Sequence, residues 1–335
     1  MSTLPALYPF GTEERWLQVA PVFFGEAGIE ATKKLLDKKV IPLQLGPELA
    51  LYLGISPKLV SHMVLRPNRY YRAFEIQKKN GGRRVITAPR VFLKTIQRYI
   101  LDCILSQIHP HSAAVGFRRG HNCGFGAHRH VGRRYVWNID LADFFPTITK
   151  SQVFEVFRNI GYPNAAALFL SGLCCLERRL PQGAPTSPAL ANLVAQPLDL
   201  KLTSIAESAS IVYTRYADDM TFSSANLISA AFRGDVVYAI ENHGFALNPT
   251  KTRLMGPAVR REVTGLTVNE KVTIARHKRR KMRAYFHHIA LSPEQYVDER
   301  QRALGYARWL FDYHPLEGAK ALEVAHRIPL AESLG

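Results

Sequence analysis

The sequence contains little that would build a membrane protein or a disulfide scaffold. No apolar run approaches the roughly 20 residues of a spanning helix, and residues 1–10 lack the basic and then apolar order of a signal peptide. The four cysteines form no CxxC pair and no evenly spaced framework, which argues against disulfides and a zinc ribbon. We therefore expect a cytoplasmic protein with no membrane partner and with reduced, mostly buried thiols.

Acidic residues are also scarce, and internal repeats and low-complexity tracts are absent. Asp and Glu total 27 against 44 Lys and Arg, which gives a formal net charge of +17. A polyanionic partner is the natural inference from such a charge. The 335 residues are 47% hydrophobic and 10% aromatic, enough to bury a large core in two or three subdomains of one continuous unit.

Two adjacent aspartates, Asp218 and Asp219, stand between two runs rich in β-branched and aromatic residues. This pattern predicts a β-hairpin with carboxylates at its tip. Neighbouring aspartates repel each other, so a turn that only reverses the chain would favour Asn-Gly or Asp-Gly. A divalent cation removes the repulsion, and oxygen-rich sites of this kind suit Mg²⁺. The alternative is a solvated acidic turn.

A third acid, Asp140, ends a strand-like run at 134–140 and is followed by a helical pattern at 149–160. Nucleotidyl transfer uses two cations about 3.5–4 Å apart, so its carboxylates must converge from separate strands. Asp140 and the Asp218–Asp219 pair can supply that arrangement if the fold brings their strand ends together. Taken alone, Asp140 could equally cap a helix or a turn.

Other segments are suited to nucleotide binding, although each also has a plain structural explanation. The proline-rich loop 180–188 precedes a helix that begins at Ser187-Pro188 and runs past Asp199, and it could hold a base and a sugar or simply connect elements. A hairpin at 70–89 carries basic residues around a Gly-Gly tip. They could grip a triphosphate or form a solvated basic surface. The basic residues are Lys78, Lys79, Arg83 and Arg84.

Helical patterns also cover much of the remaining sequence. The first 65 residues look helical and carry no evident chemistry, and an amphipathic helix is expected at 91–108. A basic helix is expected from Arg276 to about Leu291, with Met282 and Ile289 on its apolar face. Its opposite face could follow a nucleic-acid backbone or be an ordinary solvated face. A last helix is expected at 301–313.

In order along the chain, these segments resemble the fingers and palm of bacterial reverse transcriptases, with coverage from about 70 to 315. The motif that follows the palm is similar to the one that precedes the thumb in retron reverse transcriptases. The motifs are Lys-Lys…Gly-Gly-x-Arg, Asp140-Leu-Ala-Asp143-Phe-Phe145, Gln182-Gly-Ala-Pro-Thr-Ser-Pro188, Tyr-Ala-Asp-Asp, Gly244-Phe-Ala-Leu-Asn248-Pro-Thr-Lys251 and Val263-Thr264-Gly265.

The resemblance implies an α+β right-hand polymerase fold, with fingers, a palm made of an antiparallel sheet backed by helices, and a short helical thumb. The implied divisions are a helical extension at 1–65, fingers at 66–135 with part of the palm, a palm at 136–262 with a finger insertion around 150–180, and the primer grip and thumb at 263–335.

The resemblance also implies roles for individual residues. Asp140, Asp218 and Asp219 would hold two Mg²⁺ ions, and Lys251 would assist pyrophosphate departure as a general acid. Phe145 would stack on the sugar and reject a 2′-hydroxyl, although plain core packing is the alternative for one of two adjacent phenylalanines. The residues expected to bind the incoming dNTP are Lys78, Arg84, Phe145, Gln182 and Gly183.

One segment departs from the retron pattern. Retron enzymes usually carry Asn-Ala-x-x-His before the first catalytic acid, whereas this chain has Gly126-Ala127-His128-Arg129-His130. His130 matches and is expected to contact RNA. His121, Cys123, His128 and His130 also resemble metal ligands, but closed zinc sites show tighter ligand pairs, so RNA-facing or packed histidines are favoured. The other residues expected to bind nucleic acid are Val263, Thr264, Gly265, Lys278, Arg279, Arg280, Lys281 and Arg283.

These expectations combine into an RNA-directed DNA polymerase of retron type. It would copy a structured noncoding RNA into a short cDNA, primed from an RNA 2′-hydroxyl to give branched RNA–DNA, in antiphage defence beside a separately encoded effector. The alternatives are an abortive-infection, diversity-generating or intron-derived enzyme, or a silent RNA-binding protein with a polymerase fold. A silent protein should have lost a carboxylate, yet all three are present.

Overall fold

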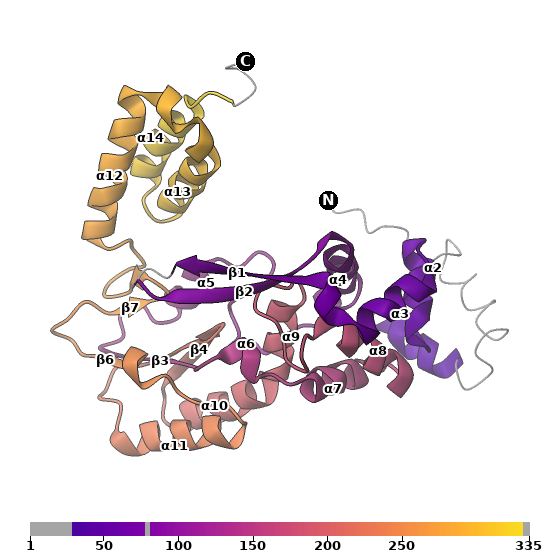
Figure 1. Ribbon diagram of the computed structural model, residues 1–335. Helices are drawn as coiled ribbons and strands as arrows, with labels where there is room; N and C mark the ends of the chain where they lie inside the picture. The colour runs from indigo at the N-terminus through magenta and orange to yellow at the C-terminus, as the bar shows by residue number, and fades with distance from the viewer. Residues whose placement is uncertain (1–28, 78–80, 331–335) are drawn as a thin grey trace.

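A four-stranded antiparallel sheet lies at the centre of the molecule. The computed structural model describes residues 29–77 and 81–330 (Figure 1). The strands are β3 (Tyr135–Asp140), β4 (Val212–Tyr216), β5 (Asp219–Ser224) and β6 (Arg253–Met255), in the order β4-β5-β3-β6. The central strand β3 therefore pairs with β5 on one side and with β6 on the other.

Two helices cover one face of this sheet. They are α10 (Gln196–Ser208) and α11 (Ala230–Asn242), which lie below the strands in Figure 1. Aromatic side chains fill the space between the layers: the rings of Tyr213 and Phe222 stack with centroids 4.8 Å apart, and Phe232 of α11 meets Phe222 edge-on. Such contacts are the usual way in which alternating strand residues bury their apolar face.

A separate two-stranded hairpin lies across the other side of the sheet in Figure 1. Its strands are β1 (Tyr71–Gln77) and β2 (Arg83–Pro89), which confirms the hairpin expected at 70–89. Helix α4 (Val91–Cys103) follows, and it ends earlier than the expected 108 because the backbone at Ile104 leaves the helical region before the short 3₁₀ turn Leu105–Gln107.

Most of the remaining helices pack beside the hairpin and sheet. Helix α7 (Lys150–Ile160) confirms the helix expected at 149–160, and it begins with a capping box between Thr149 and Gln152. The single helix expected from Ser187 past Asp199 is wrong: it breaks at Ala195, and Pro197 lies in the first turn of the next helix, α10. The helices are α2 (Leu49–Leu53), α3 (Pro57–Leu65), α5 (Cys123–His128), α6 (Phe144–Thr147), α7 (Lys150–Ile160), α8 (Asn164–Cys174) and α9 (Ser187–Val194).

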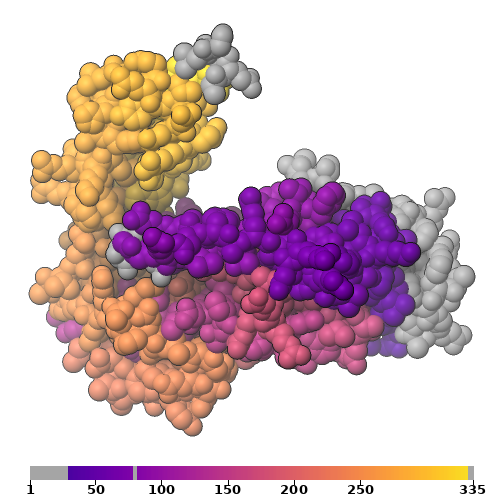
Figure 2. All heavy atoms as spheres, in the orientation of Figure 1, coloured from indigo at the N-terminus to yellow at the C-terminus, as the bar shows by residue number. Residues whose placement is uncertain are grey.

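The C-terminal part has a hydrophobic core of its own. It contains the short strands β7 (Glu262–Val263) and β8 (Leu266–Thr267) and three helices, and it stands away from the hairpin with open space between them (Figure 2). The basic helix was expected with the observed bounds, and the helix expected at 301–313 is confirmed as the second of the three, whereas the third helix was not expected. The helices are α12 (Arg276–Leu291), α13 (Arg300–Tyr313) and α14 (Pro315–His326).

The architecture is a mixed helix and sheet fold in which an antiparallel sheet is backed by helices, as expected for a right-hand polymerase. No helix in the described ranges is long and apolar enough to cross a membrane.

Candidate active site

Strand pairing brings the three predicted acids together. Asp140 and Asp219 are direct partners across β3 and β5, and Tyr216 pairs with Asp219, so Ala217 and Asp218 form a two-residue turn. Ala217 adopts φ +58°, a conformation that favours glycine and that is tolerated here at a functional turn. The carbonyl of Asp218 accepts a hydrogen bond from the Leu141 N–H (3.0 Å). The hairpin tip is thereby fixed against the end of β3.

The three carboxylates perturb one another electrostatically. Asp219 retains solvent contact, yet loss of hydration in the cleft, followed by the charges of Asp218 and Asp140, raises its pKa to about 7. Desolvation and the charge of Asp140 likewise raise the pKa of Asp218. Like charges held this close favour a shared proton or a bound cation.

Lys251 contacts the most buried of the three acids. Its Nζ lies 2.8 Å from both Oδ1 and Oδ2 of Asp140. Partial burial lowers the pKa of Lys251, but the hydrogen bond and charge of Asp140 outweigh that effect, so the net pKa is raised. The backbone holds the pair together, because the Asn248 N–H donates to the Asp140 carbonyl at 2.7 Å.

These residues suit a hard divalent cation, because they offer several carboxylate oxygens. Within residues 29–77 and 81–330 no three His, Cys, Asp or Glu side chains are already placed as a complete metal site, and both Asp140 oxygens bind the Lys251 ammonium group. The three carboxylates fit a metal by the chemistry of their oxygens, and Asp140 would have to exchange the Lys251 ammonium group for the ion.

A buried ion pair contacts the backbone of the turn between β4 and β5. The Arg215 guanidinium is fully buried and donates from Nη2 and Nε to the two carboxylate oxygens of Asp199, at 2.6 and 2.8 Å. Its Nη1 donates to the Asn192 side chain and to the carbonyl of Ala217, each at 3.1 Å. Asn192 in turn donates to the Gly116 carbonyl. Sequence reasoning missed this network, because only the fold makes these residues neighbours.

The acids open into a cavity of about 990 Å³ that is also lined by strand β2 of the β1–β2 hairpin. Its lining includes four residues that were expected to bind a nucleotide and four that were not. The expected ones are Arg84, Phe145, Gln182 and Gly183, and the unexpected ones are Lys94, Arg98, Phe117 and Asn248. Lys94 and Arg98 are four residues apart on α4, a spacing that puts both on one helix face and could have been recognised.

The loop that contains Gln182 and Gly183 is hydrogen-bonded directly to the β1–β2 hairpin. The Thr87 N–H donates to the Gln182 carbonyl at 2.8 Å. Gly183 has φ +133°, and a Cβ there would lie 2.8 Å from Ile86 Cγ2 and 3.0 Å from the Thr87 carbonyl oxygen. Only glycine permits this approach. Lys78 and Lys79, expected at the hairpin tip, lie outside the described residues.

The expected RNA contact by His130 is wrong. Its side chain is 0% exposed, and its two ring nitrogens bond the hydroxyls of Ser223 and Thr214, each at 2.7 Å. Burial, with the nearby charges of Arg129 and Arg133, lowers the pKa of His130 to about 3, so the ring is neutral. His130 therefore packs α5 against the sheet.

The other histidines of that segment form no metal site within the described part of the chain. His121 stacks on Phe125 with ring centroids 3.7 Å apart, and the thiol of Cys123 lies 3.6 Å from the Tyr313 hydroxyl. These contacts are aromatic and polar packing between α5 and its surroundings.

Several residues expected to contact nucleic acid instead build the base of the C-terminal unit. The Val263 side chain is fully buried in its core, and the Thr264 hydroxyl donates to the Cys123 carbonyl at 2.7 Å, so direct contact by the Val263 side chain is excluded. Lys278 donates to Glu262 and to the Gly265 carbonyl, and Arg279 pairs with Glu317. The residues of α12 that remain exposed include Arg280, Lys281 and Arg283.

Comparison with known proteins agrees with this arrangement. Residues 76–279 match the family model described as reverse transcriptase (RNA-dependent DNA polymerase). The retron Ec86 reverse transcriptase of Escherichia coli is 36% identical over 239 residues, covering 70% of this chain and 75% of that protein. The retron Mx65 reverse transcriptase of Myxococcus xanthus is 35% identical over 270 residues, covering 74% of this chain and 63% of that protein.

Among solved structures, the fold is distantly similar to telomerase from Candida albicans. The TM-score is 0.45 with 10% identity, over 68% of this chain and 51% of that one, and this likeness is too weak to carry a conclusion. The family match covers more than half of the chain and contains the three acids and their turn, so the chain belongs to the reverse transcriptases, RNA-directed DNA polymerases, and among them to the retron type.

Proposed function

We propose that this retron-type reverse transcriptase copies a structured noncoding RNA into a short cDNA, starting from a 2′-hydroxyl of the RNA and giving branched RNA–DNA. The single observation that carries the catalytic part is the pairing of Asp140 with Asp219 beside the turn residue Asp218. A reverse transcriptase depends on divalent metal in general. We assign Asp140, Asp218 and Asp219 as the ligands of two Mg²⁺ ions.

The reaction forms a bond between the attacking hydroxyl oxygen and the α-phosphorus of a dNTP. It breaks the bond from that phosphorus to the oxygen bridging to the β-phosphate, and it releases pyrophosphate and the hydroxyl proton. Bound at the three acids, metal ions would supply charge stabilisation at the attacking and leaving oxygens. Arg84 lies close enough to Asp218 to influence its pKa, and Lys251 bonds Asp140, so both cations adjoin the position proposed for the triphosphate. In this proposal Arg84, with Lys78, binds phosphates and Lys251 protonates the departing pyrophosphate.

The remaining cavity residues would position the nucleotide. Gln182 and Gly183 lie between the hairpin and the acids, where a base and sugar would fit. Phe145 is half-buried, and its ring centroid lies 6.1 Å from that of Phe117, which leaves part of its ring facing the cavity. Such a ring would stack against the sugar and exclude a 2′-hydroxyl.

We further assign the parts of the chain to a polymerase hand. Residues 66–135 would form fingers with part of the palm, 136–262 the palm with a finger insertion around 150–180, and 263–335 the primer grip and thumb. The extension expected at 1–65 would precede them, and its residues 1–28 lie outside the described residues. The exposed basic residues of α12 would follow the backbone of the RNA–DNA hybrid. A separately encoded effector and a role in antiphage defence complete the proposal.

The catalytic assignment is tested by replacing Asp218 and Asp219 with Asn. The double variant should lose dNTP incorporation on an RNA template while RNA binding stays nearly unchanged. The matched control is Asp235→Asn, an exposed acid of α11, which should incorporate normally. Incorporation by the double variant at the control's rate would refute the metal assignment.

The retron part of the proposal is tested by sequencing the nucleic acid that copurifies with the protein. A short DNA joined to a folded RNA through a 2′-linked branch is expected. Recovery of RNA without attached DNA from a preparation that incorporates dNTPs in vitro would refute branched priming, while leaving the polymerase assignment intact.

A further inference from the structure

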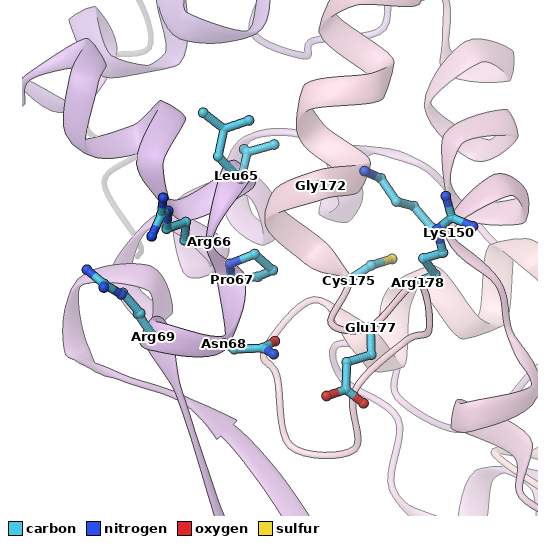
Figure 3. A pocket seen from close by; sticks show the side chains of 11 residues that line it. Leu65, Arg66, Pro67, Asn68, Arg69, Lys150, Gly172, Cys175, Glu177 and Arg178 are labelled. Atoms are coloured by element: carbon cyan, nitrogen blue, oxygen red, sulfur yellow. The ribbon is translucent and has the colours of Figure 1, made fainter.

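A second concentration of positive charge lies outside the active-site cavity. A cavity of about 510 Å³ has Arg66 and Arg69 on one wall and Lys150 and Arg178 on the opposite wall, as Figure 3 shows. An adjoining cavity is lined by Lys150, Arg178 and Arg179. We call Arg66, Arg69, Lys150, Arg178 and Arg179 the basic cluster.

The charge of the basic cluster is not compensated within the described part of the protein. The acids that line the two cavities are Glu155 and Glu177, and no ion pair joins either of them to the five cations there. Arg179 does donate a hydrogen bond, to the backbone carbonyl of Thr147. Four of the five cations are arginine, whose planar fork suits phosphate oxygens better than lysine does.

The backbone at the tip of this site is strained. Leu176 and Arg179 bond each other across a two-residue turn formed by Glu177 and Arg178, which have φ +48° and +61°. Asn and Gly normally occupy such turns, and charged residues there carry a conformational cost. Strain of this kind persists where the surrounding structure holds it, and it is concentrated at binding and catalytic sites.

The basic cluster is connected to the active site by two adjacent segments. Residues 145–150 run from the cavity wall at Phe145 to Lys150, a stretch that spans at most about 17 Å. Residues 178–183 run alongside, with Leu180 N–H donating to the Ile148 carbonyl and Lys150 N–H donating to the Arg178 carbonyl. A strand that leaves the nucleotide site along these segments would reach the cluster within a few nucleotides.

The wall beside the arginines is apolar. Leu65 is 78% exposed and lies with Pro67 and Val64 next to Arg66. A duplex presents phosphates and sugars to a protein surface, whereas a single strand also presents the faces of its bases. The combination of cations with an exposed apolar wall therefore fits single-stranded RNA better than a duplex.

We infer that the basic cluster binds the phosphates of the single-stranded RNA template that has not yet been copied, just beyond the nucleotide site. This inference rests on the proposed function, because it takes the active-site cavity as the place of copying. The cluster holds the template by its backbone without regard to sequence.

The test measures the binding of RNA–DNA hybrids that are not extended during the assay, so its result does not depend on polymerisation. One hybrid is blunt at the downstream end, and the other carries a ten-nucleotide single-stranded RNA overhang there. The test variant is Arg66→Gln/Arg178→Gln. The matched control is Lys201→Gln/Lys320→Gln, which removes two exposed charges from α10 and α14.

Wild type and the control should bind the overhang hybrid more tightly than the blunt hybrid. The test variant should lose that difference, and its plot of log affinity for the overhang hybrid against log salt concentration should flatten by about 1.4, since each single-strand phosphate contact contributes about 0.7. Its affinity for the blunt hybrid should match wild type, which also shows that the variant is folded.

Three results would overturn the inference. An unchanged preference for the overhang in the test variant would show that these cations do not contact the template. An equal loss of affinity for both hybrids, or the same loss in the control, would show general attraction by net charge. Failure of the proposed function would instead appear as absent dNTP incorporation by the wild type, with overhang-dependent binding unaffected.

Discussion

The buried Arg215–Asp199 pair should be necessary for the position of the hairpin tip as well as for stability. Replacing Arg215 by Met leaves the Asp199 carboxylate fully buried, with the Tyr213 hydroxyl as a remaining donor. Removing one partner of a buried ion pair costs about 3–5 kcal/mol. The single variant should therefore be strongly destabilised, and its loss of activity alone would not separate folding from catalysis.

A second substitution separates the two effects. In Arg215→Met/Asp199→Asn the buried charge is gone, and the new side-chain amide would still accept from the Tyr213 hydroxyl, so most of the lost stability should return. The hydrogen bond from Arg215 to the Ala217 carbonyl is not restored. A bond from a charged donor contributes about 1.5–3 kcal/mol, which corresponds to a fall of about 10- to 150-fold in incorporation rate if it acts on the transition state.

The assay combines thermal denaturation with single-nucleotide incorporation at saturating dNTP. The expected result is a double variant with a Tm close to wild type, a strongly reduced kcat and nearly unchanged hybrid binding. Full activity in a double variant whose stability has returned would refute the argument that Arg215 positions the turn. Failure of the second substitution to recover any stability would refute the assignment of the cost to an unpaired Asp199.

Three further predictions concern the cavity. Gly183→Ala should raise the KM for dNTP several-fold, because its Cβ would collide with Ile86 and Thr87, and steady-state kinetics with an unchanged KM would contradict this. Phe145→Ala should increase ribonucleotide incorporation in a competition assay, and an unaltered sugar preference would leave Phe145 a packing role. The folded state raises the Asp219 pKa from 3.8 to about 7, so it binds more protons than the unfolded chain and loses stability as pH rises between these values. With a chelator present, the Tm of the wild type should fall as the pH rises across this range, and the fall should be smaller in Asp219→Asn. A wild-type Tm that does not change with pH would contradict this prediction.

Local sequence pattern was sufficient for the elements whose alternation or periodicity is strong. The runs on either side of Asp218 and Asp219 alternate as strands do, and α12 has a clear apolar face, so both were located correctly. Pairing between Asp140 and Asp219 is different, because it depends on β3 lying between β5 and β6. Strand pattern alone does not give strand order, and the resemblance to a known family supplied it.

The elements and contacts that were missed have weak local signals. Helix α8 is almost entirely apolar, so it has no polar face from which a helical period could be read. Helix α14 approaches α13 so closely that a Cβ on Gly318 would lie 2.1 Å from the Phe311 Cα. A glycine in a helix does not by itself indicate such a tertiary contact. His130 matched a family motif, yet its burial between Ser223 and Thr214 depends on how α5 packs on the sheet.

Strand β3 explains how the C-terminal unit is held relative to the catalytic acids. Successive strand residues face opposite ways, so Val136, Asn138 and Asp140 share one face while Trp137 and Ile139 share the other. Trp137 and Ile139 pack into the core of the sheet and its helices. Val136 packs instead into the C-terminal core, and the Asn138 side chain donates to the Glu262 carbonyl at 2.7 Å. The face that presents Asp140 therefore also anchors the base of α12, and a shift of β3 would move both together.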